Sequence, residues 1–289
     1  MSTVAVAVGP SPASVARRET LRALLRSKTF VVGMLIVGWW VFCAILGSAI
    51  APQDPLAQSA NVLASPSSHH LFGTDQLGRD VFSRVLAGAQ SILTIAPAAT
   101  LLAVVAGTTL GLVTGYKRGA VDDIVSRLTE AILSLPLIVL AFTVIVALGN
   151  STATLVVVVG VLFTPLIART VRAAVLVERE RDYVPASQLR GERAPYIMFV
   201  EILPNVAAPI IVEATVRLGY AIFTVASLTF LGFGVQEPSP DWALQIYDNY
   251  TLLAAGTYWW TVLFPALAIA SLVIGLNLIA DGISQVIER

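Results

Sequence analysis

The chain has 289 residues, of which 56% are hydrophobic and only 12% charged, and its 18 basic and 18 acidic side chains leave no net charge. Soluble domains are about 45–50% apolar and about 25% charged, so this composition excludes an ordinary water-soluble enzyme. Zero net charge also gives no general attraction to nucleic acid, and a mean hydropathy of +0.81 indicates an integral membrane protein.

The first apolar run, residues 29–51, predicts a membrane-spanning helix, since 23 residues at about 1.5 Å each cross a hydrocarbon core of about 30 Å. A cleaved signal peptide is the alternative, because basic residues precede the run and Ala49-Ile50-Ala51 resembles a cleavage site. The apolar core is longer than the roughly 7–15 residues of a signal, which favours an uncleaved helix. Cys43, the single cysteine, is interpreted as a packing residue.

Five further apolar runs are close to span length, at residues 89–114, 124–148, 153–172, 207–232 and 259–281. The chain is therefore predicted to be an all-α integral membrane protein with six transmembrane helices. Longer polar stretches join some of the spans, at residues 52–88, 173–206 and 233–258. The first 28 residues and residues 285–289 are predicted to be terminal segments outside the membrane.

The distribution of Lys and Arg predicts how the chain is oriented. With a cytoplasmic N-terminus, fifteen of these residues fall on the cytoplasmic side, whereas only Arg79 and Arg84 fall outside and Arg217 lies within a span. Both termini and the loop 173–206 are therefore predicted to be cytoplasmic. The loops 52–88 and 233–258 are predicted to be extracytoplasmic.

Several small, kink-forming and charged residues lie inside the predicted spans. Gly107, Gly111 and Gly115 share one helix face and predict close contact with a neighbouring helix. A proline lies in or at the start of every span after the first and favours a kink there. Glu213 and Arg217 are four residues apart, so they are expected to form an intrahelical ion pair. Their pairing is either structural or part of a polar translocation pathway, and both interpretations stay open.

No HExxH, GxSxG or GxxxxGK[ST] motif occurs in the chain. His69 and His70 have no nearby third ligand, so no metal site is predicted. If ATP drives a process through this protein, the nucleotide must bind to another polypeptide.

The cytoplasmic segment 173–206 is expected to fold as a helical hairpin. Asp182 is a candidate N-cap for a short helix ending at Leu189 or Arg190, and Gly191 is a natural stop. A second helix from Pro195 to Leu203 is expected to end at Pro204. A short rigid helix between two spans can dock into a second protein and transmit its movement into the membrane.

This segment resembles the EAA motif of ABC importer permeases, through Tyr183-Val184-Pro185-Ala186-Ser187, Gly191 and Ile202-Leu203-Pro204-Asn205. Residues 70–80, HLFGTDQLGRD, are similar to the C-type permease subunit of dipeptide and oligopeptide importers. The sequence of residues 228–236, LTFLGFGVQ, at the end of the fifth span is also similar to the corresponding segment of that family. The likeness covers roughly residues 20–285, and the combined motifs are highly specific.

The resemblance implies a type I ABC importer permease fold in a bacterial cytoplasmic (inner) membrane, with a permease core at 89–284. It implies a B-type permease partner, two ATPase domains on one or two chains and an extracytoplasmic peptide-binding protein. This chain then has no catalytic residue and no cofactor of its own, and ATP and Mg bind to the partner subunits. Dipeptides or oligopeptides are the implied cargo. One alternative is a permease of the same family that carries nickel or another small solute. Another is a secondary transporter that works without ATP.

The family's coupling helix corresponds to the 183–191 helix. The residues expected to shape the joint with the ATPase are Asp182, Tyr183, Pro185, Ala186, Ser187, Gly191, Glu201, Leu203, Pro204 and Asn205. Three of them depart from the motif: Pro185 replaces its glutamate, Ser187 its second alanine, and Glu201 the histidine often found before Leu-Pro. These departures leave the spacing of the motif unchanged.

The loop 233–258 is acidic and aromatic and contains no Lys or Arg. Such a surface suits contact with the binding protein, although an ordinary outer loop also looks acidic. The candidate contact residues are Glu237, Asp241, Trp242, Tyr247, Asp248 and Tyr250.

Overall fold

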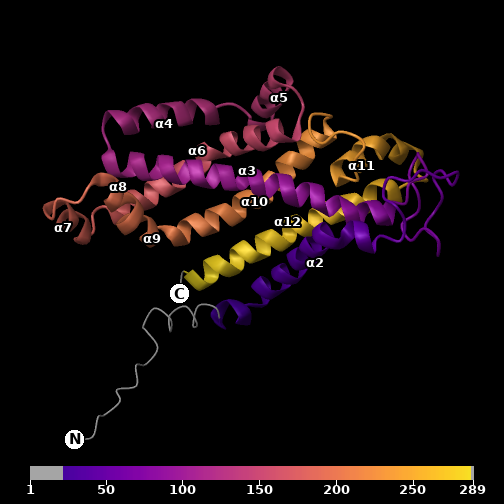
Figure 1. The fold of residues 1–289 in the computed structure, drawn as a ribbon, viewed down its shortest axis with the longest axis horizontal. Coiled ribbons are helices and arrows are strands. Elements are labelled where there is room, and N and C mark those ends of the chain that lie inside the picture. The colour runs from indigo at the N-terminus through magenta and orange to yellow at the C-terminus, as the bar shows by residue number, and fades with distance from the viewer. Residues whose placement is uncertain (1–21, 288–289) are drawn as a thin grey trace, which may run out of the picture.

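The computed structural model describes residues 22–287, and this part of the chain is helical apart from connecting loops and one isolated bridge between Thr74 and Asp80 (Figure 1). The predicted N-terminal segment 1–28 lies mostly outside the described residues. The all-α prediction is confirmed for the described range.

Five helices are each long and apolar enough to cross a membrane: α2 (Lys28–Ile50), α3 (Val81–Lys117), α6 (Thr152–Glu178), α10 (Ala207–Phe230) and α12 (Trp260–Ile287). A sixth crossing is provided only if α4 (Ala120–Leu133) and α5 (Leu137–Leu148) count as one broken span. Between α6 and α10 lie four short pieces: α7 (Tyr183–Leu189), α8 (Ala194–Tyr196), the π-helical η1 (Ile197–Ile202) and α9 (Leu203–Asn205). The opposite end carries α11 (Trp242–Asn249) and the 3₁₀ helix η2 (Tyr250–Ala255).

The predicted span 124–148 is broken into two helices, because α4 and α5 meet at an angle of 90°. Pro136 occupies the N-cap position of α5, and a proline disfavours helical backbone in the residue before it. Elsewhere, α3, α6 and α12 continue as helices through Pro97, Pro165 and Pro265. Among these prolines, only Pro136 lies at a sharp break, because it stands between two helices and not inside one.

The only buried residue of α4 is Asp122, whose carboxylate accepts hydrogen bonds from Nε and Nη2 of Arg172 in α6 at 2.6 and 2.7 Å. This bidentate pair is a strong form of ion pair and fastens α4 to α6. Asp122 lies in the first turn of α4, and Gly119 holds its N-cap position.

Helix α3 begins at Val81, earlier than the predicted span at 89, because the Asp80 side chain caps it by accepting a hydrogen bond from the Ser83 amide. Its 37 residues extend about 55 Å, which exceeds a hydrocarbon core of about 30 Å. The first turns of α3 therefore belong to the outer part of the molecule rather than to a loop.

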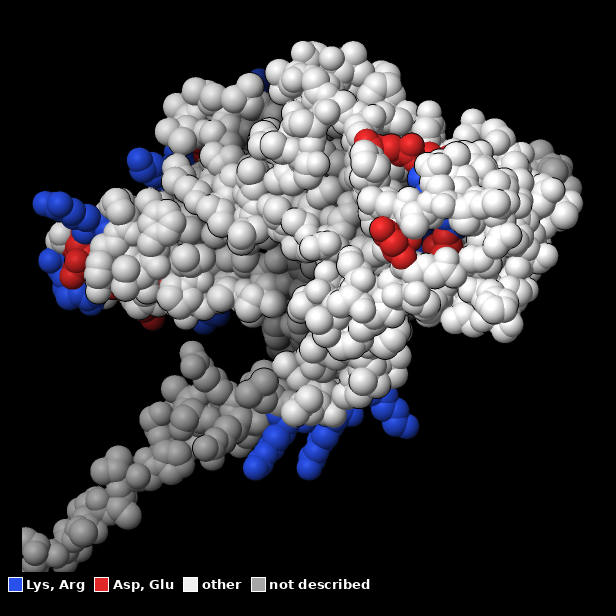
Figure 2. All heavy atoms as spheres, turned by 45° about the vertical axis from the view of Figure 1, so that its right-hand side comes forward, with Lys and Arg blue, Asp and Glu red and all other residues white. Residues whose placement is uncertain are grey.

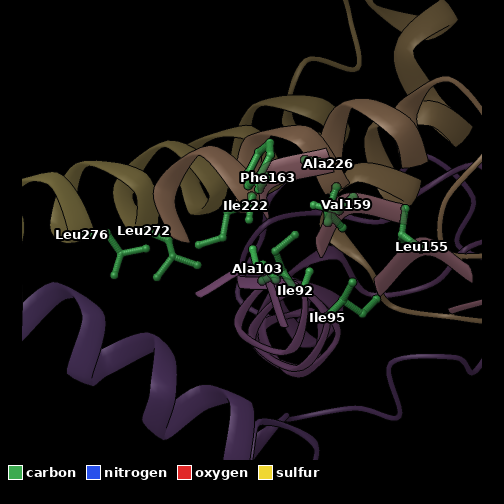
Figure 3. Packing of buried hydrophobic residues seen from close by; sticks show 14 of the residues in the cluster. Ile92, Ile95, Ala103, Leu155, Val159, Phe163, Ile222, Ala226, Leu272 and Leu276 are labelled. Carbon is green, nitrogen blue, oxygen red and sulfur yellow. The ribbon is translucent and has the colours of Figure 1, made fainter. Parts of the chain in front are cut away.

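Figure 3 shows the part of the apolar core where α3, α6, α10 and α12 meet. Ile92 and Ala103 of α3 face Val159 and Phe163 of α6, and α10 and α12 contribute from the other side. The predicted glycine face of α3 lies against α6. A Cβ placed on Gly111 would come within 2.7 Å of Cβ of Val171 and 2.8 Å of the Ala168 carbonyl oxygen. The glycines thus permit an approach that any side chain would prevent.

Helices α2 and α12 run side by side in opposite directions (Figure 1). Trp40 connects them by donating a hydrogen bond from Nε1 to the Ser271 hydroxyl at 2.9 Å. Its ring also packs edge-on against Trp242 at 4.7 Å between centroids. These contacts explain why Trp40 can lie in the middle of a span, since its indole N–H has a hydrogen-bond partner there.

The start of α2, the end of α12 and α7 lie at one end of the bundle, and α11 lies at the other (Figure 1). On the face drawn in Figure 2, blue atoms lie mainly near the α7 end and the start of α2, red atoms also gather at the opposite end, and the surface between is nearly free of charge. An uncharged zone between two charged ends is what a membrane-spanning bundle requires.

Replacing Gly111 with valine is expected to destabilise the chain by about 1–3 kcal/mol, because the added methyl groups force α3 away from the α6 backbone. The apparent melting temperature in detergent measures this effect. Gly38→Val on α2 is the matched control, since a Cβ at Gly38 meets nothing within 4 Å. Equal melting temperatures for the two variants would contradict the close approach of α3 and α6.

Candidate functional site

Helix α7 projects from the end of the bundle and has one buried and one exposed side (Figure 1). Val184 and Ser187 are each 1% exposed, whereas Pro185 and Ala186 are exposed and Leu189 is 90% exposed. An apolar side chain exposed to this degree on a fixed helix is available to a partner protein. The exposed side of α7 is the candidate coupling surface, defined by Pro185, Ala186 and Leu189.

The ends of α7 match the prediction only in part. Gly191 has φ +79°, a left-handed conformation that glycine adopts without strain, so it ends the helix as expected. Asp182 precedes the helix, but its side chain makes no capping hydrogen bond and its backbone is helical. The expected side-chain cap at Asp182 is therefore wrong.

Tyr183 connects α7 to the helices on both sides of the loop. Its hydroxyl donates to Oε1 of Glu178 at 3.1 Å, at the end of α6, and accepts from Nδ2 of Asn205 at 3.1 Å, in α9. Burial, together with the neighbouring Glu178, raises the pKa of the Tyr183 phenol. The phenol therefore stays protonated and keeps the donor that binds Glu178.

A second set of contacts involves Arg190 and Glu201. Nη2 of Arg190 donates to the Ser187 hydroxyl at 2.8 Å and to Oε1 of Glu201 at 3.0 Å, so the end of α7 is joined to η1. The other carboxylate oxygen of Glu201 is buried and has no hydrogen-bond partner within the described residues. Two of the departures from the motif, Ser187 and Glu201, thus take part in one network that holds α7.

The expected helix end at Pro204 is wrong, because helical backbone runs from Ala194 through η1 and α9 to Asn205. A proline ring clashes with the carbonyl four residues before it in a regular α-helix. The wider π-helical turn of η1, just before Pro204, shifts those carbonyls and lets the helix continue. Leu203 is half-buried and Pro204 is exposed, so of these two expected contact residues only Pro204 lies fully at the surface.

Glu213 and Arg217 form the intrahelical pair that their spacing predicts. Nε of Arg217 lies 2.6 Å from Oε1 of Glu213, and the guanidinium lies 5.5 Å from the centre of the Tyr220 ring. The side chains are 15% and 20% exposed, for Glu213 and Arg217 respectively. Both reach the surface of α10 rather than the core of the bundle.

The outer end contains a charge cluster that the sequence analysis did not identify, formed by Asp75, Arg79, Arg84, Glu237 and Asp248. Arg79 is at its centre: Nε donates to Asp75 at 2.6 Å, Nη1 to Glu237 at 2.9 Å and Nη2 to Asp248 at 3.2 Å. The cluster ties the loop before α3 to the loop containing α11, some 160 residues away. The available signal was that Arg79 and Arg84 are the only cations predicted outside, opposite an acidic loop.

The histidine pair has a related structural role. Nδ1 of His70 lies 3.0 Å from Oδ1 of Asp80, the residue that caps α3. Within the described residues no group of three or more His, Cys, Asp or Glu side chains is placed to hold a metal ion.

The outer-loop docking prediction is wrong for two residues. Asp241 is 1% exposed and caps α11 through Oδ1, and Trp242 is fully buried with its Nε1 donating to the Val85 carbonyl at 2.7 Å. Burial raises the pKa of the Asp241 carboxyl. Asp248 is also largely buried, in the charge cluster. Glu237, Tyr247 and Tyr250 remain at the surface, the two tyrosines 44% and 47% exposed.

Comparison with known proteins identifies related families and relatives. Residues 107–289 match the family model described as binding-protein-dependent transport system inner membrane component, and residues 16–66 match the N-terminal TM domain of oligopeptide transport permease C. The chain is 36% identical to the dipeptide transport system permease protein DppC of Alkalihalophilus pseudofirmus, with 94% of this chain and 89% of the relative covered. It is 35% identical to the di/tripeptide transport system permease protein DppC of Pseudomonas aeruginosa, with 97% and 93% covered. Identity to the dipeptide transport system permease protein DppC of Escherichia coli is 39%, with 91% and 89% covered.

Replacing Glu201 with alanine is expected to loosen α7, because Arg190 loses its carboxylate partner. A charge-assisted hydrogen bond of this kind contributes about 1 kcal/mol, so amide exchange in residues 183–190 should accelerate roughly three- to tenfold. Hydrogen–deuterium exchange of the chain in detergent measures this. The control is Glu192→Ala, an exposed glutamate beside the same helix. Unchanged exchange in the Glu201 variant would show that α7 is held by other contacts.

The outer charge cluster is expected to depend on pH. Burial and the nearby Glu237 raise the pKa of Asp248 to about 6, so the folded chain binds this proton more tightly than the unfolded chain does. Between about pH 4 and pH 6 the contribution of this carboxyl to stability therefore rises as the pH falls. Wild type should gain thermal stability relative to Asp248→Asn when the pH is lowered from about 7 to about 5. Asp54→Asn, at an exposed position, serves as the control. If the stabilities of both variants changed with pH in the same way, the prediction would be contradicted.

Proposed function

Because the chain belongs to the family of binding-protein-dependent transport system inner membrane components, we propose that it is the transmembrane permease subunit of an ATP-driven importer of dipeptides or oligopeptides. The peptide class follows from relatives named as dipeptide and di/tripeptide permeases that align over nearly the whole chain. The subunit forms half of the translocation pathway, beside a second permease of the B type. It hydrolyses no ATP itself.

The observation that carries this function is the fixed helix α7 with its exposed apolar side. Two ATPase domains, on one chain or two, bind Mg-ATP and contact Pro185, Ala186 and Leu189 of the coupling surface. The abundance of Lys and Arg around α7 and the start of α2 supports a cytoplasmic position for this end and for both termini. An extracytoplasmic peptide-binding protein then docks at the opposite end, where Glu237, Tyr247 and Tyr250 are exposed.

The hydrogen bonds of α7 specify how a movement of the ATPases enters the membrane. Tyr183 joins α7 to the end of α6, and Asn205 and Glu201 join it to the helical segment that leads into α10. A displacement of α7 therefore moves α6 and α10 together. Close packing of α6 on the glycines of α3 passes the displacement on to α3, whose first turn belongs to the outer charge cluster. A single displacement of α7 by the ATPases therefore moves helices at both the inner and the outer end of the pathway.

Transport measurements distinguish this function from two alternatives. A permease of the same family for nickel or another small solute would transport that solute, and not peptides, when assembled with its partners. A secondary transporter would move its substrate when this chain is reconstituted without any ATPase and without nucleotide.

Replacing Ala186 with arginine is expected to abolish docking of the ATPase, since a bulky cation is placed in the middle of the exposed side of α7. Co-purified ATPase and peptide-stimulated ATP hydrolysis should fall at least about tenfold, equivalent to about 1.4 kcal/mol of lost binding. Ala57→Arg makes the same change in an exposed loop at the other end of the molecule. Normal ATPase binding by the Ala186 variant would refute the role of α7.

A further inference from the structure

The surface of α10 near its middle carries hydrogen-bond donors that no protein group accepts. Arg217 donates from Nε to Glu213, yet neither of its Nη groups has a hydrogen-bond partner within the described residues. Oε2 of Glu213 likewise has none there. One salt bridge therefore leaves both a guanidinium edge and a carboxylate oxygen available to a ligand.

Two more polar side chains lie beside this pair. Tyr220 of α10 is 56% exposed, and Asn277 of α12 is also exposed. The described residues provide neither side chain with a hydrogen-bond partner. Together with Gly219 they line a cavity of about 210 Å³ between α10 and α12. A Cβ placed on Gly219 would lie 3.4 Å from Oδ1 of Asn277, an ordinary contact distance, so the two residues face each other across this cavity.

Unpaired polar groups are costly in contact with lipid, because hydrocarbon offers them no hydrogen bond. Ionisable side chains inside a span usually face a water-filled cavity or a substrate. The surface around Arg217, Tyr220 and Asn277 is therefore one that water or a polar ligand covers, and not lipid chains.

A second cavity continues from the first toward the outer end. It has a volume of about 460 Å³ and shares Phe223 and Val273 with the smaller cavity. Its other lining residues come from α10, α11 and α12 and are almost all apolar, among them Phe230, Ile246 and Ile269. The two cavities form one trough, with Tyr220 and Asn277 at its inner end and almost only apolar residues at its outer end. Glu213 and Arg217 do not line the trough, but the Arg217 guanidinium lies 5.5 Å from the centre of the Tyr220 ring and so borders its inner end. Sites for small molecules typically occupy about 300–1,000 Å³, so the trough has the size of a ligand site.

We propose that this trough binds the peptide in transit by its charged termini, an inference that rests on the proposed function. The C-terminal carboxylate of the peptide accepts hydrogen bonds from the Nη groups of Arg217. Its N-terminal ammonium donates to Oε2 of Glu213, and Asn277 contacts the peptide backbone. Apolar side chains of the peptide lie against Phe223, which both cavities share. Because Glu213 and Arg217 cancel in charge, the site suits a zwitterion rather than a simple cation or anion.

The first test uses the transporter assembled from both permeases, its ATPases and its binding protein in proteoliposomes. A dipeptide containing benzoylphenylalanine is illuminated during ATP turnover, and the labelled residues are mapped by mass spectrometry. Labels are expected in residues 216–230 of α10 and 266–277 of α12. Arg217→Gln should reduce labelling and probe uptake at least about tenfold, a loss of about 1.4 kcal/mol.

Arg127→Gln is the matched control, since this exposed arginine lies on α4, a helix that contributes no residue to either cavity. It should keep wild-type labelling and uptake. Wild-type uptake of the probe without any label on α10 or α12 would overturn the trough proposal while leaving the proposed function intact. Failure of wild type to transport any peptide would instead overturn the proposed function.

A second measurement does not depend on variants of the charged pair. Tyr220→Cys in the assembled transporter should react with a charged methanethiosulfonate reagent, and peptide should protect it during turnover. Wild type provides the background, because Cys43 is fully buried. A Tyr220→Cys variant that stays unreactive would overturn the proposal, because it would show that a helix of the partner permease or lipid covers the trough.

Discussion

The close contact between α3 and α6 is the interaction on which the rest of the molecule depends. Three glycines on α3 face Ile167, Val171 and Val175 of α6, so the two backbones approach more closely than side chains would allow. In a bilayer the hydrophobic effect gives little reason for helices to associate, and packing of this kind takes its place. The two helices also connect the two ends of the molecule. Helix α3 starts in the outer charge cluster, and α6 ends at Glu178, which binds Tyr183 of α7.

Charged groups are used in two different ways. At the outer end, Arg79 joins three carboxylates from two distant loops, so that the loops become one rigid layer over the helices. At the inner end, the Arg190–Glu201 pair and the Tyr183 hydroxyl hold α7 between the helices on either side of it. Between these layers the Glu213–Arg217 pair keeps hydrogen-bonding capacity that the described residues do not use.

The departures from the family motif in the α7 region have a local explanation in two cases. Glu201 provides the acceptor for Arg190, and Ser187 provides a second acceptor for the same guanidinium. Both side chains face inward and stabilise the hairpin. Pro185 is exposed on the coupling surface, in the first turn where proline costs no helical hydrogen bond. Proline at this position is therefore compatible with the helix that this chain forms.

Composition, apolar run length and glycine spacing determined the all-α membrane class, the positions of most spans, the close face of α3 and the stop at Gly191. These are local properties, set by the cost of unpaired backbone in lipid and by the freedom of a residue without a Cβ. The 90° break at Pro136, the passage of helix through Pro204 and the burial of Asp241 and Trp242 were decided only by tertiary structure. A loop that reads as acidic and aromatic does not reveal which of its side chains face inward, because contacts with residues some 160 positions away decide it.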